Sequence, residues 1–141
     1  MTAYTGRCLC GVVSVKLHGK IDSIIHCHCS LCRKNSGTAF ATNGFINKAE
    51  FEILSGQDDL SVFEFKPGVK RHFCRHCGSP VYSSNAQKPD LLRIRLGLLD
   101  SDIDERPISH NFIDSKANWH DLDAALPRYP EFEPGRQTKK S

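Results

Sequence analysis

The stretch Cys27-His28-Cys29-Ser30-Leu31-Cys32 places three cysteines within six residues and belongs to a pattern that runs along the chain. The other four of the seven cysteines form two shorter clusters, Cys8-Leu9-Cys10 and Cys74-Arg75-His76-Cys77. A thiolate is a strong zinc ligand, and two cysteines separated by one or two residues can hold one ion without a strained loop. The grouping predicts two zinc ions per chain, because structural sites take four ligands whereas reactive sites keep an open position.

The composition favours a single domain in a reducing compartment. The chain has 141 residues, and we expect one domain over residues 1–129, followed by a proline-rich, disordered tail over 130–141. No signal peptide and no apolar run of membrane-spanning length is visible, so we expect a cytoplasmic protein that contacts no membrane. Thiols stay reduced there, and an odd number of cysteines disfavours a disulfide framework.

Short runs of alternating apolar and polar residues, separated by turn signals such as Asn43-Gly44 and Pro67-Gly68, indicate an all-β, mainly antiparallel fold. Only residues 30–36 and 115–125 favour helix. The expected strands cover residues 12–17, 21–27, 40–46, 50–54, 60–65, 69–74, 80–84 and 91–99.

The cysteines fit this scaffold in two groups. Residues two apart on a strand point to the same face. Cys8 and Cys10 can therefore reach one ion, and so can Cys27 and Cys29. The third cluster is followed by Gly78 and resembles a zinc knuckle. Joining the two-cysteine clusters predicts a structural site, and its ligands are Cys8, Cys10, Cys74 and Cys77. The remaining cysteines lie too close in sequence to surround an ion, which leaves one side of it open; they are Cys27, Cys29 and Cys32.

Over nearly its whole length the chain resembles the glutathione-dependent formaldehyde-activating enzyme family, which includes the centromere protein V type of domain. The resemblance rests on the cysteine clusters with their flanking residues, on Gly97-Leu-Leu-Asp100 and on a closing segment that spans residues 110–119 and Leu126-Pro127. It implies a fold of stacked sheets and the same two zinc sites. It also implies condensation of glutathione with formaldehyde, which is a carbon–sulfur lyase reaction when written in reverse.

The three-cysteine site suits that chemistry. Three thiolates donate electron density to zinc and leave a weak Lewis acid, which is better matched to accepting a fourth sulfur than to hydrolysing a substrate. We therefore expect glutathione and a small aldehyde as substrates. Arg33 follows the cluster directly and is the first candidate partner for a glutathione carboxylate, and Lys116, from the closing segment, is a weaker one.

Other residues carry plainer interpretations. His26 and His28 flank the ligands, but strand alternation turns their rings away from the metal. Arg93 and Arg95 alternate with apolar residues and are expected on the solvated face of a strand.

Two alternatives to the enzyme remain open. The first is a non-catalytic zinc module, in which His28 or a residue from elsewhere such as His110 closes the second site, or a glutathione carrier. The second is a nucleic-acid binder, which is disfavoured because the sequence has no clustered basic stripe with interleaved aromatic residues.

Overall fold

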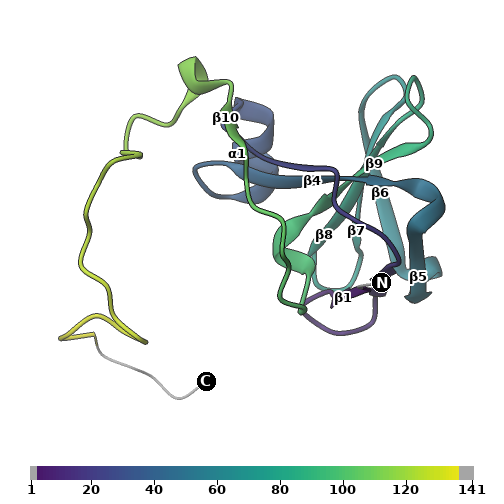
Figure 1. Ribbon diagram of the computed structural model, residues 1–141, viewed down its shortest axis with the longest axis horizontal. Coiled ribbons are helices and arrows are strands. Elements are labelled where there is room, and N and C mark those ends of the chain that lie inside the picture. The colour runs from purple at the N-terminus through teal and green to yellow at the C-terminus, as the bar shows by residue number, and fades with distance from the viewer. Residues whose placement is uncertain (1–2, 137–141) are drawn as a thin grey trace.

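The computed structural model describes residues 3–136 and contains two stacked β-sheets (Figure 1). The predicted all-β, mainly antiparallel fold is confirmed, with one parallel strand pair. The large sheet consists, in spatial order, of β10 (Ser109–Asn111), β3 (Ser23–Cys27), β4 (Ala41–Asn47), β9 (Leu91–Arg95), β8 (Pro80–Asn85), β7 (Val69–Cys74) and β6 (Leu60–Lys66). The small sheet consists of β1 (Tyr4–Arg7), β2 (Ser14–Leu17) and β5 (Phe51–Ser55).

The main core lies between the two sheets. Alternate residues of β2, Val15 and Leu17, are fully buried and face Ile24, Ile46 and Ile94 of the large sheet in one apolar cluster. Burying each of these side chains stabilises the fold by about 1.5–3 kcal/mol. The alternation that marks the strands in the sequence therefore also determines which face of each strand enters the core.

The helices are short. The helix α1 (Ser30–Ser36) has the predicted bounds, and it ends at Gly37, whose φ of 73° places it in the left-handed region that glycine tolerates best. Four single turns of 3-10 helix complete the regular structure of the described residues: η1 (Lys48–Glu50), η2 (Gln57–Asp59), η3 (Leu96–Leu98) and η4 (Ile113–Ser115). None of the helices within residues 3–136 has the length and hydrophobicity needed to cross a bilayer.

The predicted helix over residues 115–125 is wrong, because only η4 forms and it ends at Ser115. Most of the following residues are exposed, Trp119 and Leu122 among them. A helix of about ten residues is marginal in water unless an apolar face packs against the protein. Of residues 116–125 only Ala117 is buried, so the segment has no apolar face of that kind. Figure 1 shows it running away from the sheets.

Further differences concern strand bounds and the tail. The last predicted strand ends at Arg95, where η3 begins, instead of continuing to residue 99. The short strands β1 and β10 were not predicted, because pairing with distant strands fixes them more than local pattern does. Of the expected tail, residues 130–136 contain no helix or strand, and residues 137–141 lie outside the described part of the chain.

Candidate metal centres

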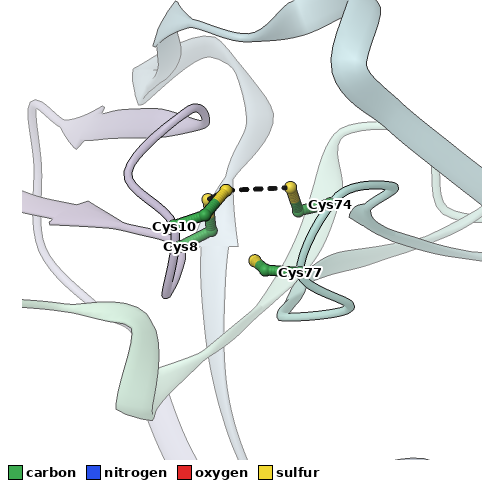
Figure 2. A group of neighbouring side chains, drawn as sticks. All are labelled: Cys8, Cys10, Cys74 and Cys77. Carbon is green, nitrogen blue, oxygen red and sulfur yellow. Dashed lines mark hydrogen bonds between the residues drawn. The ribbon is translucent and has the colours of Figure 1, made fainter.

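The first group of cysteines forms a closed cluster of four sulfurs, called centre one below. Its members are Cys8, Cys10, Cys74 and Cys77, and all their sulfur atoms lie within 4.8 Å of one another. Figure 2 shows two of them on one loop, facing the other two across a small gap. All four are free thiols in the structure.

The spacing of these sulfurs fits a zinc ion. Cys8 Sγ lies 3.6 Å from Cys10 Sγ, which lies 3.7 Å from Cys74 Sγ. Sulfurs at the corners of a tetrahedron with Zn–S bonds of about 2.3 Å are about 3.8 Å apart. A disulfide would bring two sulfurs to about 2.05 Å, so the cluster has the geometry of ligands to a common ion.

Two tight turns bring the halves of centre one together. The first follows β1, and in it the Val13 N–H donates to Cys8 Sγ at 3.3 Å. Cys8 and Cys10 thus lie in a turn, and the assumption that they share a strand face is wrong. The second turn follows β7, where the Gly78 N–H donates to the Cys74 carbonyl at 2.8 Å, as expected of a knuckle.

Glycine is required where the first turn leaves the sheet. A Cβ atom on Gly6 would lie 2.5 Å from the carbonyl oxygen of Leu98, far inside van der Waals contact. Only glycine therefore lets β1 pass this close to η3. The close approach fixes the direction in which the chain enters the turn that carries Cys8 and Cys10.

Ser79 links the two halves of centre one. Its Oγ accepts a hydrogen bond from the Leu9 N–H at 2.9 Å and lies 3.2 Å from Cys77 Sγ. The Ser79 hydroxyl, followed by its N–H, lowers the pKa of Cys77 to about 5, because both groups stabilise the thiolate. Ser79 thus prepares a ligand in the charged form that a metal requires.

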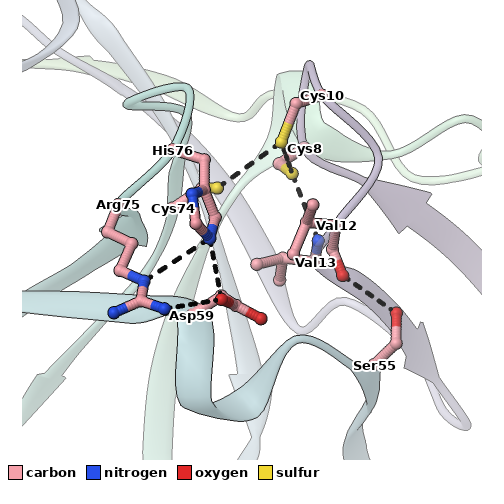
Figure 3. A network of polar contacts seen from close by, with 9 residues as sticks. All are labelled: Cys8, Cys10, Val12, Val13, Ser55, Asp59, Cys74, Arg75 and His76. Atoms are coloured by element: carbon pink, nitrogen blue, oxygen red, sulfur yellow. Dashed lines mark hydrogen bonds and ion pairs between the residues drawn. The ribbon is translucent and has the colours of Figure 1, made fainter.

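A polar cluster supports the knuckle from outside. Figure 3 shows Asp59 between Arg75 and His76, with its Oδ1 2.7 Å from His76 Nε2 and 3.2 Å from Arg75 Nη2. The hydrogen bond with His76, and then that with Arg75, holds the pKa of Asp59 below its usual range. These contacts tie the turn between Cys74 and Cys77 to η2.

The second group, called centre two below, has three sulfurs from Cys27, Cys29 and Cys32, which also lie within 4.8 Å of one another. Cys27 ends β3, and Cys29 is the N-cap of α1, where its Sγ accepts a hydrogen bond from the Cys32 N–H at 3.3 Å. Within residues 3–136, no histidine, aspartate or glutamate has a ligand atom within 4.8 Å of all three sulfurs.

The thiols of centre two differ in acidity. Burial raises the pKa of Cys27 to about 12. Burial alone would raise that of Cys29 as well, but the Cys32 N–H and the neighbouring thiols outweigh it and lower the pKa below the ordinary value. The Cys29 thiol is therefore more acidic than the Cys27 thiol, and an ion binding to both would displace a proton from Cys27.

Neither histidine suggested as a fourth ligand joins this group. His28 is fully buried, and its Nε2 lies 2.9 Å from Nδ1 of His110 on β10. The two rings pack with those of His26 and Phe40, and His26 in turn bonds to Thr42 Oγ1 at 2.9 Å. Burial, and then the proximity of His110, lowers the pKa values of His26 and His28, which favours neutral rings.

The two cations predicted to contact substrate, Arg33 and Lys116, both donate to backbone carbonyls in this structure. Arg33 Nε donates to the His28 carbonyl at 3.4 Å. Lys116 Nζ donates to the carbonyls of Ala117 and His120. Arg33 and Lys116 are both half-buried, and neither forms an ion pair with a residue in the described part of the chain.

A different cation, Arg95, lies beside centre two and was not predicted there. Its guanidinium donates to Asn43 Oδ1 on β4 and to Asn35 Oδ1 on α1, the latter at 2.7 Å. Arg95 is half-buried, although it was expected on a solvated face. Its alternation with apolar neighbours was visible, but the pairing of β9 with β4 that brings it to the cysteines was not.

A family comparison agrees with this geometry. The sequence model described as "Glutathione-dependent formaldehyde-activating enzyme" matches residues 3–115, a span that includes all seven cysteines. The chain belongs to this family. The predicted family resemblance is thereby confirmed.

Individual relatives are distant. A protein of Halomonas elongata, provisionally named a glutathione-dependent formaldehyde-activating enzyme, is 25% identical over 127 residues, which cover 84% of this chain and 80% of that protein. An uncharacterized lyase of Schizosaccharomyces pombe is 26% identical over 82 residues, 58% of each chain. The crystal structure of a Rhodobacter sphaeroides protein superposes with a TM-score of 0.60 at 21% identity, covering 75% of this chain and 98% of that one, and supports the fold.

Proposed function

We propose that the protein is a zinc-dependent carbon–sulfur lyase-type enzyme that binds a thiol, glutathione, at centre two and promotes its addition to formaldehyde or a related small aldehyde. The observation that carries the proposal is the difference between the centres, because four sulfurs complete one ligand set and three leave the other incomplete. The family name and the name of the Halomonas elongata relative support the choice of substrates.

The donor sets fit zinc at both places. Centre one would hold a structural ion through Cys8, Cys10, Cys74 and Cys77, and centre two would hold a second ion through Cys27, Cys29 and Cys32. When bound at centre two, zinc would supply one position for a thiol sulfur and would lower the pKa of that thiol.

The addition of the thiol to the aldehyde needs no oxidant or reductant. The sulfur electron pair forms a bond to the carbonyl carbon, the C=O π bond breaks, and the carbonyl oxygen takes up a proton, while the thiol proton is released to water. The protein contributes mainly by holding the two reactants together, which can supply several kcal/mol of the barrier. Arg33 and Lys116 remain proposed contacts for glutathione carboxylates, with the backbone carbonyls as their present partners. Because glutathione is a reducing-compartment thiol, we place the reaction in the cytoplasm.

Titration of the metal-loaded protein with glutathione and with S-methylglutathione tests sulfur binding. We expect glutathione to bind at least about tenfold more tightly, a difference of about 1.4 kcal/mol. Its affinity should rise with pH until the free thiol ionises, because a thiolate binds with release of a proton. Equal affinities would show that the sulfur does not coordinate, and would favour the non-catalytic zinc module.

Turnover is tested separately from binding. The rate at which glutathione and isotopically labelled formaldehyde exchange with their adduct can be measured by NMR, with and without catalytic amounts of protein. Acceleration by the native protein and none by Cys29→Ser would support an enzyme. Tight stoichiometric binding without acceleration would identify a glutathione carrier.

A further inference from the structure

A row of arginines lies on the outer face of the large sheet and begins at centre two. Residues directly opposite one another on paired strands share a face, as do residues two apart on one strand. The register of β3, β4, β9, β8 and β7 therefore places one set of residues on the face that carries centre two: Cys27, Ala41, Asn43, Arg95, Arg93, Ser83 and Arg71.

Two of these arginines converge on a single amide. Asn35 Oδ1 accepts one hydrogen bond from Arg71 Nη1 at 2.9 Å and another from Arg95 Nη2 at 2.7 Å. Arg95 also donates to the buried Asn43. Like charges at such separations repel, and a neutral amide oxygen only partly offsets the repulsion.

Within residues 3–136, the two guanidinium groups have no carboxylate partner. None of the ion pairs found between residues 3 and 136 includes Arg71 or Arg95. Burial, and then the charge of Arg71, lowers the pKa of Arg95, whereas the thiols of Cys32 and Cys27 raise it. Arg95 therefore lies between a second cation and the sulfurs of centre two.

The charges at this place do not balance without a ligand. Three thiolates around a divalent ion leave one net negative charge, whereas the two guanidinium groups carry two positive charges. Each guanidinium has five N–H donors; Arg95 uses two on amide oxygens and also contacts the Cys32 thiol, and Arg71 uses one. The free donors and the excess positive charge both favour an anion with planar, paired oxygens, which is a carboxylate.

Each guanidinium lines its own cavity, and no cysteine of centre two lines either of them. Arg95 lines a cavity of about 690 Å³ that extends to the turn carrying Cys8 and Cys10. Arg71 and Asn35 line a smaller cavity of about 250 Å³, together with Phe63 and other residues. The Arg71 guanidinium lies 4.8 Å from the ring centroid of Phe65, which holds it toward this cavity.

We propose that Arg71 and Arg95, bridged by Asn35, form a carboxylate-binding site beside centre two, and that it binds an anionic end of the thiol substrate. The choice of a thiol rests on the proposed function, whereas the anion site rests on its own residues. The site selects thiols that carry a carboxylate over neutral thiols of similar size.

Two probes separate the anion site from the sulfur site in the metal-loaded full chain. S-methylglutathione carries the carboxylates but offers no thiolate, and 2-mercaptoethanol offers a thiol but no carboxylate. Arg95→Gln should weaken S-methylglutathione about 10- to 100-fold, as expected for a charge-assisted hydrogen bond, and should affect 2-mercaptoethanol far less. Arg71→Gln should act in the same direction. Affinities are measured by NMR titration, which also reports whether each variant is folded.

Arg93 provides the matched control. It lies on the same strand and face as Arg95, but its guanidinium stacks on Phe45 at 5.4 Å and makes no hydrogen bond to Asn35. Arg93→Gln removes the same charge and should leave the affinity for S-methylglutathione unchanged. Arg95→Lys keeps the charge without the paired donors and should recover only part of the loss.

The outcomes distinguish the two proposals. If the native protein does not bind S-methylglutathione, or if Arg95→Gln and Arg71→Gln bind it as tightly as the native protein, the anion site is overturned. An equal loss in Arg93→Gln would also overturn it, because general charge would then explain the effect. If 2-mercaptoethanol fails to bind while Arg95→Gln still loses S-methylglutathione, the anion site stands and the proposed thiol chemistry fails.

Discussion

Centre one and centre two use the same ligand atom but tie together different parts of the molecule. Centre one joins the turn after β1 to the turn after β7, and Cys10 and Cys74, whose sulfurs are 3.7 Å apart, are separated by 64 positions in the sequence. Centre two is confined to the end of β3 and the first turn of α1. Closing a long loop couples metal binding to the fold, whereas a local cluster can form on a strand and helix that are already held by the sheet.

The polar and charged groups around the two centres also differ. Centre one is supported by a hydroxyl, by backbone N–H groups and by a knuckle whose Arg75 is paired with Asp59. Centre two lies beside the guanidinium group of Arg95, which has no carboxylate partner in the described part of the chain. A site whose charges are already satisfied is suited to a structural role, and one with surplus charge is suited to binding a ligand.

The largest expected effect comes from removing one ligand of centre one. Cys74→Ser should leave the chain largely unfolded, because binding free energy of about 10 kcal/mol or more is coupled to folding at structural zinc sites. Cys29→Ser should remain folded and should lose only the metal of centre two. Circular dichroism and thermal unfolding of the two purified variants measure the difference. If both variants unfold alike, the division into a structural and a functional centre is wrong.

Metal removal sharpens the comparison without mutation. Fresh reduced protein should contain two zinc ions, and a competing chelator should remove the ion of centre two first, because three ligands leave a position through which the chelator can bind. A chromogenic chelator followed over time, with metal content measured at each stage, should show two phases. Cys29→Ser provides the control and should show only the slow phase. Release of both ions in one phase would contradict the view that centre one is closed by four ligands and centre two is open.

Much of the fold follows from local pattern, and the exceptions have a common cause. The strand over residues 69–74 and the helix over 30–36 match the structure because their signals, alternation and a glycine after the last turn, are local. The strands β1 and β10 depend on partners far along the chain, which local pattern does not reveal. The helix expected near Trp119 does not form, because its large apolar side chains, Trp119 and Leu122, stay exposed.

The residues of the candidate site also fall into those that local sequence pattern predicts and those that it does not. Both sulfur groups were predicted from spacing and counting, although the reason given for Cys8 and Cys10 was wrong, since they lie in a turn. Arg95 could not be found from sequence, because its role depends on which strand lies beside β9. Spacing reveals ligands that are neighbours in sequence, whereas contacts between strands require the register.

The smallest expected effect concerns the hydroxyl that joins the halves of centre one. Ser79→Ala removes a hydrogen bond to Cys77 and an acceptor for the Leu9 N–H. Loss of such an outer contact typically lowers metal affinity by about 10- to 100-fold, so zinc should leave centre one faster while the chain stays folded at saturating zinc. Ser84→Ala is the matched control, because Ser84 bonds to His72 on another part of the sheet. Competition with a chelator of known affinity measures the change, and centre two should retain its native affinity in both variants. An unchanged affinity at centre one in Ser79→Ala would show that its four sulfurs and the knuckle determine metal binding without help from the hydroxyl.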